Sequence, residues 1–204
     1  MRISADIVGR EIVPGEQRVD ARWLMAYSAG LGETDFPHPL FPVCYEWPAT
    51  RQIRERAGLA PIDAGLVHAQ HDLTIHRPPK AEALRVSGKV VAALQRRPGA
   101  LDRAYARAAG LPDIILHGTA TLALSISNVL QAFKADPLAV RRARCRFSGM
   151  VLMPNTLQVC GVVSGNRIFF ETRNAAGELV VSRASIDLDG RAGDRAQHVP
   201  RSSA

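Results

Sequence analysis

A long apolar run from Gly118 to Phe133 constrains this chain more than any other feature. Apolar side chains recur along it at the spacing of one broad helical face. They are Ala120, Leu122, Leu124, Ile126, Val129, Leu130 and Phe133. The run is too short to cross a bilayer, which takes roughly 20 residues of helix. The sequence therefore predicts a helix that is buried on most of its sides.

Four strands are predicted after this helix, over Ala143–Leu152, Thr156–Val163, Arg167–Arg173 and Leu179–Asp187. Short segments rich in Pro, Asn, Ser and Gly separate the strands, and these residue types favour tight turns. A buried helix followed by a meander of strands indicates an antiparallel sheet wrapped around the helix. The predicted fold class is therefore α+β.

The first half of the chain looks like a partial copy of the second, with helices ahead of strands. Its predicted elements are helices over Ala21–Gly30 and Val43–Arg56 and strands over Gly65–His76 and Leu84–Leu94. Three prolines exclude regular structure between Phe36 and Pro42. A short helix is expected over Asp102–Ala109, where Asp102 would be the N-cap.

These patterns predict three regions. Residues 1–100 form a partial N-terminal half, and residues 101–189 form a C-terminal half whose central helix covers about 118–133. Residues 190–204 are polar and contain Gly, Pro and Ser, so they are expected to be a disordered tail.

The net charge of +7 raises the question of nucleic-acid binding. The arginines are scattered, however, and no basic stripe is interleaved with aromatic residues, which argues against a nucleic-acid partner. A basic balance also attracts small polyanions such as coenzyme phosphates. The first residues have no apolar core typical of a secretory signal, and no membrane association is predicted. Cys44, Cys145 and Cys160 lack metal-ligand spacing, which predicts buried thiols in a reducing cytoplasm.

The segment Pro112–Thr121 (PDIILHGTAT) resembles the central motif of the MaoC-like, or hydratase 2, family of (R)-specific enoyl-CoA hydratases and dehydratases. Arg146–Leu157 resembles the strand and turn that follow it in that family. Pro39–Val43, Glu46–Pro48 and His76–Pro78 resemble the degenerate first half of its double hot-dog members.

The resemblance implies a degenerate double hot-dog fold, in which a sheet wraps around a central helix. It also implies an acyl-CoA thioester as substrate, with no further cofactor and no metal. A homodimer, or a heteromer with a second hot-dog chain, is expected because missing strands would leave sheet edges uncovered.

One family feature is missing from the sequence. The family's acid–base pair is an Asp and a His in a pattern similar to Ser-Gly-Asp-x-Asn-Pro-x-His, upstream of the helix motif. Neither Ser-Gly-Asp nor Asn-Pro-x-His occurs in this chain. Arg97–Ala100 is followed directly by Leu101–Gly110, so the segment that would carry both side chains is absent between Ala100 and Leu101.

Gly118 is the main candidate catalytic position. At the start of the helix, unpaired backbone N–H groups and the positive end of the helix dipole converge, and they could stabilise the enolate oxygen that develops on a thioester. Alternatively, Gly118 only allows the helix to pack closely against the sheet. His117 is a second catalytic candidate, and its alternative role is to cap the helix. Thr119, Arg144 and Arg146 are candidate substrate-binding residues, the two arginines because they share one strand face and could contact coenzyme phosphates.

A metal site formed by His68, His71, Asp72 and His76 is not expected. On a strand, His68, Asp72 and His76 would share one face and His71 would point to the other. A separation of four residues along a strand corresponds to about 13 Å, which is too far for one ion.

Two functions remain open at this point. The first is a MaoC-like acyl-CoA hydratase or dehydratase, which adds water to an enoyl thioester or removes it from a 3-hydroxyacyl thioester. The second is a non-catalytic hot-dog subunit that binds an acyl thioester or supports an active partner. A hot-dog thioesterase is a weaker third alternative.

Overall fold

The computed structural model describes residues 5–56, 68–92, 115–190 and 202–203. The chain divides into two compact units. Unit 1 comprises Met1–Asp20, Pro42–Val67 and Ala81–Pro112, and unit 2 comprises Ala21–Phe41, His68–Lys80 and Asp113–Ala204. The larger sheet and the central helix belong to unit 2, which therefore takes segments from both halves of the sequence.

The sheet of unit 2 is antiparallel throughout its described strands, in the order β10-β7-β8-β9-β5-β2. Its strands are β2 (Gln70–Thr74), β5 (Val140–Phe147), β7 (Gln158–Ser164), β8 (Arg167–Arg173), β9 (Leu179–Leu188) and β10 (Ser202–Ser203). The strands β7, β8 and β9 form the predicted meander, whereas β5, the first of the four predicted strands, pairs with β9 and not with β7. Gly165, at the turn between β7 and β8, has a φ of +60°, a conformation that glycine adopts without strain.

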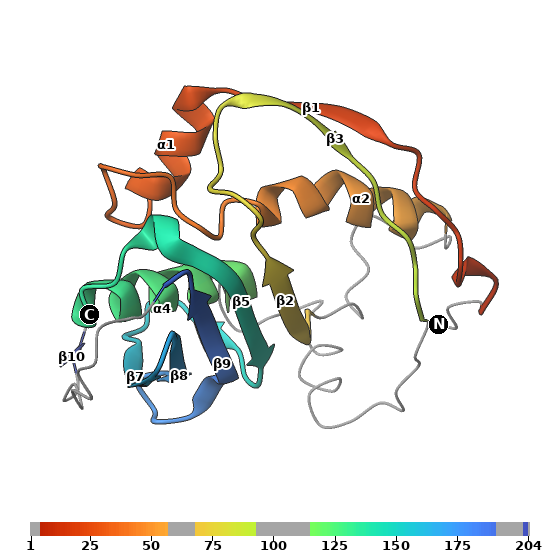
Figure 1. Ribbon diagram of the computed structural model, residues 1–204. Coiled ribbons are helices and arrows are strands. Elements are labelled where there is room, and N and C mark those ends of the chain that lie inside the picture. The colour runs from red at the N-terminus through yellow and green to blue at the C-terminus, as the bar shows by residue number, and fades with distance from the viewer. Residues whose placement is uncertain (1–4, 57–67, 93–114, 191–201, 204) are drawn as a thin grey trace. The chain divides into compact units, whose positions relative to one another are not determined.

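Helix α4 (Gly118–Ala132) lies across one face of this sheet (Figure 1). Leu122 and Ile126 are fully buried on the helix, and Ile168 and Ile186 are fully buried on β8 and β9. Each such side chain contributes about 1.5–3 kcal/mol to folding when it leaves water. Inside this apolar layer, the hydroxyls of Ser125 on α4 and Thr172 on β8 share a hydrogen bond of 2.7 Å. The predicted central helix and the α+β class are confirmed.

Helix α1 (Ala21–Ala29) packs on the proline-rich segment that follows it. The ring of Phe41 lies edge-on to both Trp23 and Tyr27, with centroids 5.2 and 5.5 Å away. In this segment, backbone N–H groups donate to side chains instead of to the carbonyls of a helix or strand. The Ser28 hydroxyl accepts from the His38 N–H at 2.8 Å, and His38 Nδ1 accepts from the Leu40 N–H at 3.1 Å.

Unit 1 contains a two-stranded antiparallel ribbon of β1 (Gly15–Val19) and β3 (Glu82–Val86), the helix α2 (Val43–Arg56) and a short 3₁₀ helix η1 (Ala5–Ile7). The side-chain amide of Gln52 on α2 exchanges two hydrogen bonds with the backbone of Val13. Pro48 lies inside α2, which runs from Val43, so the proline does not mark the start of the helix.

Several predictions fall outside the described residues. The expected short helix Asp102–Ala109 and the boundary near residue 100 lie there. So does most of the expected tail over 190–204, apart from Gly190 and the two residues of β10. Among the described helices, none is long and apolar enough to span a lipid bilayer.

The buried histidines should make the stability of unit 2 depend on pH. Burial lowers the pKa of His38 and of His71 from 6.5 to about 4. The unfolded chain therefore binds protons that the folded chain does not between pH 6.5 and about 4. Stability should fall as pH falls through this window, with a slope of up to ~1.4 kcal/mol per pH unit for each histidine.

A His38→Asn variant tests this, because the asparagine side-chain oxygen can still accept from Leu40. Urea unfolding at several pH values between 6.5 and 4.5 should show a slope smaller than the wild-type slope by about one proton. Equal slopes in the two proteins would show that His38 is not the source of the pH dependence.

Candidate functional site

The N-terminus of α4 is fixed by strand pairing and by a side-chain cap. The preceding strand β4 (Ile115–Leu116) pairs antiparallel with β6 (Val151–Leu152). His117 then occupies the N-cap position, with extended φ and ψ of −60° and 140°. Its Nδ1 accepts from the Thr119 N–H at 3.3 Å and lies 2.8 Å from the Thr119 hydroxyl. The capping role considered for His117 is therefore present in the structure.

This cap also sets the tautomer of His117. Because Nδ1 accepts a backbone N–H, a neutral His117 carries its proton on Nε2. The His117 carbonyl accepts from the Thr121 N–H at 3.0 Å. The first N–H groups of a helix have no partner within the helix, so those of Gly118 and Ala120 are candidate donors to a ligand.

Gly118 lies against the ring of Phe147, the last residue of β5. A Cβ added at Gly118 would come within 3.1 Å of two ring carbons of Phe147. The close packing of helix on sheet, which was the structural explanation for this glycine, is therefore present. It is compatible with the oxyanion role, which stays a prediction, because the same small residue leaves the backbone N–H uncovered by a side chain of its own.

Histidines from a distant part of the sequence also lie at this end of unit 2. The ring of His68 lies 4.8 Å from that of Phe147 and 5.3 Å from that of His71. Burial lowers the pKa of His68, and the nearby His117 lowers it further. The prediction that His68 shares a strand face with Asp72, away from His71, is wrong, because His68 precedes β2 and turns toward His71.

A metal centre does not follow from this grouping. In the part of the chain that the structure describes, no set of three or more His, Cys, Asp or Glu side chains is placed to hold an ion. Burial also raises the pKa of the neighbouring Cys145 thiol to about 12, so this cysteine is protonated and unsuited to act as a nucleophile.

A cavity of about 690 Å³ lies along α4 within unit 2. Its walls come from the segment after α1, from α4, and from the region of β6 and β7. Leu116, Leu124, Ser127 and Met153 are among its lining residues. The buried Ser127 hydroxyl has no hydrogen-bond partner among the described residues. The lining includes Leu116 before the helix, α4 side chains between Leu124 and Gln131, and residues beyond the helix end such as Lys134.

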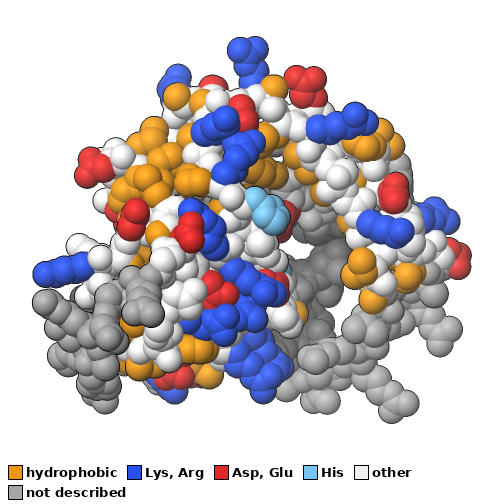
Figure 2. Space-filling view, in the orientation of Figure 1, with side chains coloured by type: hydrophobic (Ala, Val, Ile, Leu, Met, Phe, Trp, Pro, Cys, Tyr) orange, Lys and Arg blue, Asp and Glu red, His pale blue; other side chains and the backbone are white. Residues whose placement is uncertain are grey.

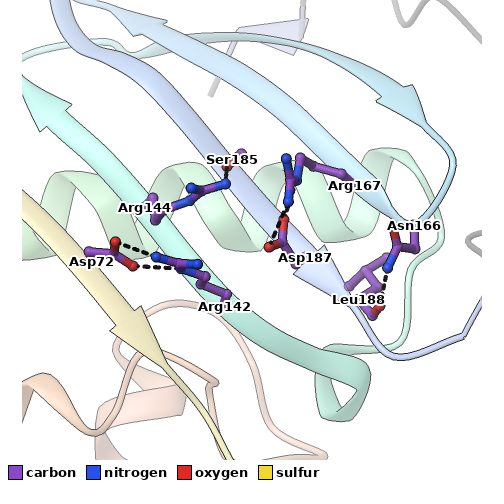
Figure 3. A network of polar contacts seen from close by, with 8 residues as sticks. All are labelled: Asp72, Arg142, Arg144, Asn166, Arg167, Ser185, Asp187 and Leu188. Atoms are coloured by element: carbon purple, nitrogen blue, oxygen red, sulfur yellow. Dashed lines mark hydrogen bonds and ion pairs between the residues drawn. The ribbon is translucent and has the colours of Figure 1, made fainter.

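Arg144 lies on the face of the sheet that is opposite to α4. Figure 3 shows Arg142, Arg144 and Asp187 in front of the sheet, with the α4 ribbon behind it. The guanidinium of Arg142 donates to both carboxylate oxygens of Asp72 at 2.7 and 2.8 Å, and Arg167 forms an ion pair with Asp187. Lys and Arg side chains gather among acidic ones on the side of the molecule seen in Figure 2.

The structure therefore divides the predicted site residues into two groups. His117, Gly118 and Thr119 are adjacent at the start of α4. Arg144 donates to the Ser185 hydroxyl at 3.5 Å on the opposite sheet face, and Arg146 shares that face by strand alternation. Asp102, the expected N-cap, and Asp113, within the segment Pro112–Thr121, lie outside the described residues.

Comparison with known proteins shows which protein family this chain resembles. The family model described as MaoC like domain matches residues 101–184. Residues 101–184 are therefore similar to a MaoC-like domain. This match, with the curated relatives below, confirms the resemblance to the MaoC-like, hydratase 2 family.

Curated relatives of this chain include two enzymes named peroxisomal multifunctional enzyme type 2. The mouse protein is 35% identical over 120 residues, covering 55% of this chain and 16% of that protein. The Drosophila melanogaster protein is 35% identical over 137 residues, covering 65% of this chain and 22% of that protein. Peroxisomal enoyl-CoA hydratase 2 of Arabidopsis thaliana is 31% identical over 90 residues, covering 44% of this chain and 29% of that protein. The chain thus spans less than a third of the length of each of these relatives.

Solved structures support the fold of the MaoC-like domain and of the whole chain. The MaoC-like dehydratase from Phytophthora capsici superposes with a TM-score of 0.69 at 15% identity, covering 96% of this chain and all of that one. Peroxisomal multifunctional enzyme type 2 from Drosophila melanogaster superposes with a TM-score of 0.62 at 19% identity. The match covers 87% of this chain and 48% of that one. These likenesses confirm the hot-dog fold.

The contact between Gly118 and Phe147 predicts the effect of a larger residue at the start of α4. A Gly118→Val substitution should lower the free energy of unfolding by about 1–3 kcal/mol, because the new side chain meets the Phe147 ring. In a Phe147→Leu background, the same substitution should cost less.

Urea unfolding of the two single variants and the double variant measures this coupling. Gly15→Val is the matched control, since a Cβ at Gly15 meets no atom within 4 Å. Additive effects of the two substitutions would contradict the proposed contact.

Proposed function

We propose that this chain binds an acyl-CoA thioester, with the thioester carbonyl at the start of α4 and the acyl chain in the cavity along that helix. The reaction type that we propose is hydration of an enoyl-CoA, or the reverse dehydration of a 3-hydroxyacyl-CoA. The observation that carries the proposal is the largely apolar cavity along α4, whose lining includes Leu116, two residues before the capped helix start at Gly118.

The helix start suits a thioester oxygen that gains negative charge. Backbone N–H groups at the first turn and the positive end of the helix dipole stabilise such an oxygen, typically by a few kcal/mol for each donor. Among the described residues, no acidic side chain occupies the first turn of α4 to compete for these donors.

The cavity suits an acyl chain. Its volume of about 690 Å³ lies within the range of small-molecule sites, roughly 300–1,000 Å³. Leu116, Leu124 and Met153 offer apolar contact surface, and each methylene of a bound chain that leaves water contributes about 0.8 kcal/mol.

The coenzyme end of the ligand is less closely defined. The net charge of +7 favours the approach of a polyanion. Arg144 and Arg146 lie on the far sheet face, so we leave them out of the proposed thioester site. No further cofactor is proposed, and a cytoplasmic location and a dimeric or heteromeric assembly remain proposals.

A second candidate function is that of a non-catalytic hot-dog subunit, which binds an acyl thioester or supports an active partner. The observation that favours it is the absence of Ser-Gly-Asp and Asn-Pro-x-His from the sequence. Binding of the thioester is common to both candidates, whereas turnover of crotonyl-CoA belongs only to the first.

Blocking the cavity tests the binding proposal. A Leu124→Trp substitution puts a large ring into the cavity and should weaken binding of octanoyl-CoA by about 10-fold, the equivalent of losing two methylene contacts. Binding of free coenzyme A should not change, because it has no acyl chain.

Isothermal titration calorimetry measures both affinities. Val162→Trp is the control, because Val162 is 52% exposed and does not line the cavity. If the Leu124 variant bound octanoyl-CoA as tightly as the wild type, the acyl chain would not occupy this cavity.

A further inference from the structure

His68 and His71 are brought to this end of unit 2 by one strand pairing. In the register of β2 against β5, His71 is opposite Cys145, and the Phe147 N–H donates to the Ala69 carbonyl at 3.0 Å. This pairing puts the His68 ring on the Phe147 ring, 4.8 Å between centroids. Gly118 lies against the same Phe147 ring. His68 and the start of α4 therefore share this aromatic neighbour.

Of the histidines at this end of unit 2, His68 is the one suited to exchange protons with a ligand. His71 is only 5% exposed, which removes it from a ligand in the solvent-accessible part of the site. His117 uses Nδ1 to cap the helix. His68 is half-buried and keeps access to solvent.

The surroundings of His68 keep it neutral near pH 7. Burial lowers its pKa, and the proximity of His117 lowers it further. His71 on β2 is the other titratable ring in contact with it. The carboxylate of Asp72 on β2 acts on His71 and is paired with Arg142. A neutral imidazole can accept a proton, so His68 has the ionisation state that a general base needs.

We infer that His68 transfers the proton in the hydration of an enoyl thioester held at Gly118, in place of the family's acid–base pair. The inference rests on the proposed function. The imidazole takes a proton from water while the water oxygen bonds to C3 of the enoyl group. The electron pair of the C2–C3 double bond moves through C2 to the thioester oxygen, which the N–H groups of α4 stabilise. The imidazolium then returns its proton to C2, so the residue ends the cycle unchanged.

Crotonyl-CoA hydration by the full chain from about pH 5 to 8 tests the inference, with His68→Gln as the main variant. His76→Gln is the matched control, because His76 is an exposed histidine beyond the other end of the same strand. A His68→Ala variant is assayed with and without added imidazole, and butyryl-CoA binding is titrated for each protein.

Loss of a proton-transferring residue should lower kcat by about 100- to 10,000-fold and leave KM within about threefold. The wild-type rate should fall in acid, with an apparent pKa below 6.5, because protonated His68 is not a base. Imidazole should restore part of the rate of His68→Ala, and His76→Gln should behave as the wild type.

The alternative results separate the two proposals. If His68→Gln hydrates crotonyl-CoA at the wild-type rate, or if the wild-type rate does not fall in acid, the role of His68 is overturned. The hydratase function is then retained. Butyryl-CoA binding without hydration also overturns the role of His68 and leaves the non-catalytic function. Failure of the wild type to bind either thioester overturns both.

Discussion

The close approach of the Phe147 ring to Gly118 connects the fold of unit 2 with its candidate site. It sets how near the first turn of α4 lies to the last residue of β5, and a side chain at residue 118 would increase that separation. The same ring also contacts His68. The packing of the helix, the position of its uncapped N–H groups and the position of a titratable imidazole therefore depend on one contact.

Most of the second half of the fold could be predicted because its signals are local. The apolar spacing from Leu122 to Phe133 defines α4, and turn residues define the strands that follow. The face shared by Arg144 and Arg146 also follows from strand alternation. Their distance from the start of α4 does not, because alternation within a strand does not say which face the helix covers.

The histidine grouping could not be predicted from local patterns. His68 and Phe147 are far apart in sequence and meet because β2 pairs with β5. The expectation for His68 failed for a related reason, since β2 begins at Gln70 and strand alternation does not extend back to His68. A histidine that precedes a strand and approaches the start of a helix leaves no recognisable spacing in the sequence.

The missing Ser-Gly-Asp and Asn-Pro-x-His patterns and the observed helix start concern different parts of the proposed reaction. Stabilising a thioester oxygen needs only backbone donors, which α4 provides, whereas moving a proton needs a side chain with a suitable pKa. The account therefore depends first on whether a thioester carbonyl reaches those donors. The most direct measurement is the infrared difference spectrum of butyryl-CoA, labelled with carbon-13 at its carbonyl, bound to the wild-type chain. The account predicts that the carbonyl stretch moves to lower frequency on binding, as hydrogen bonds from α4 polarise the bond. A bound thioester whose carbonyl frequency equals that in water would contradict it.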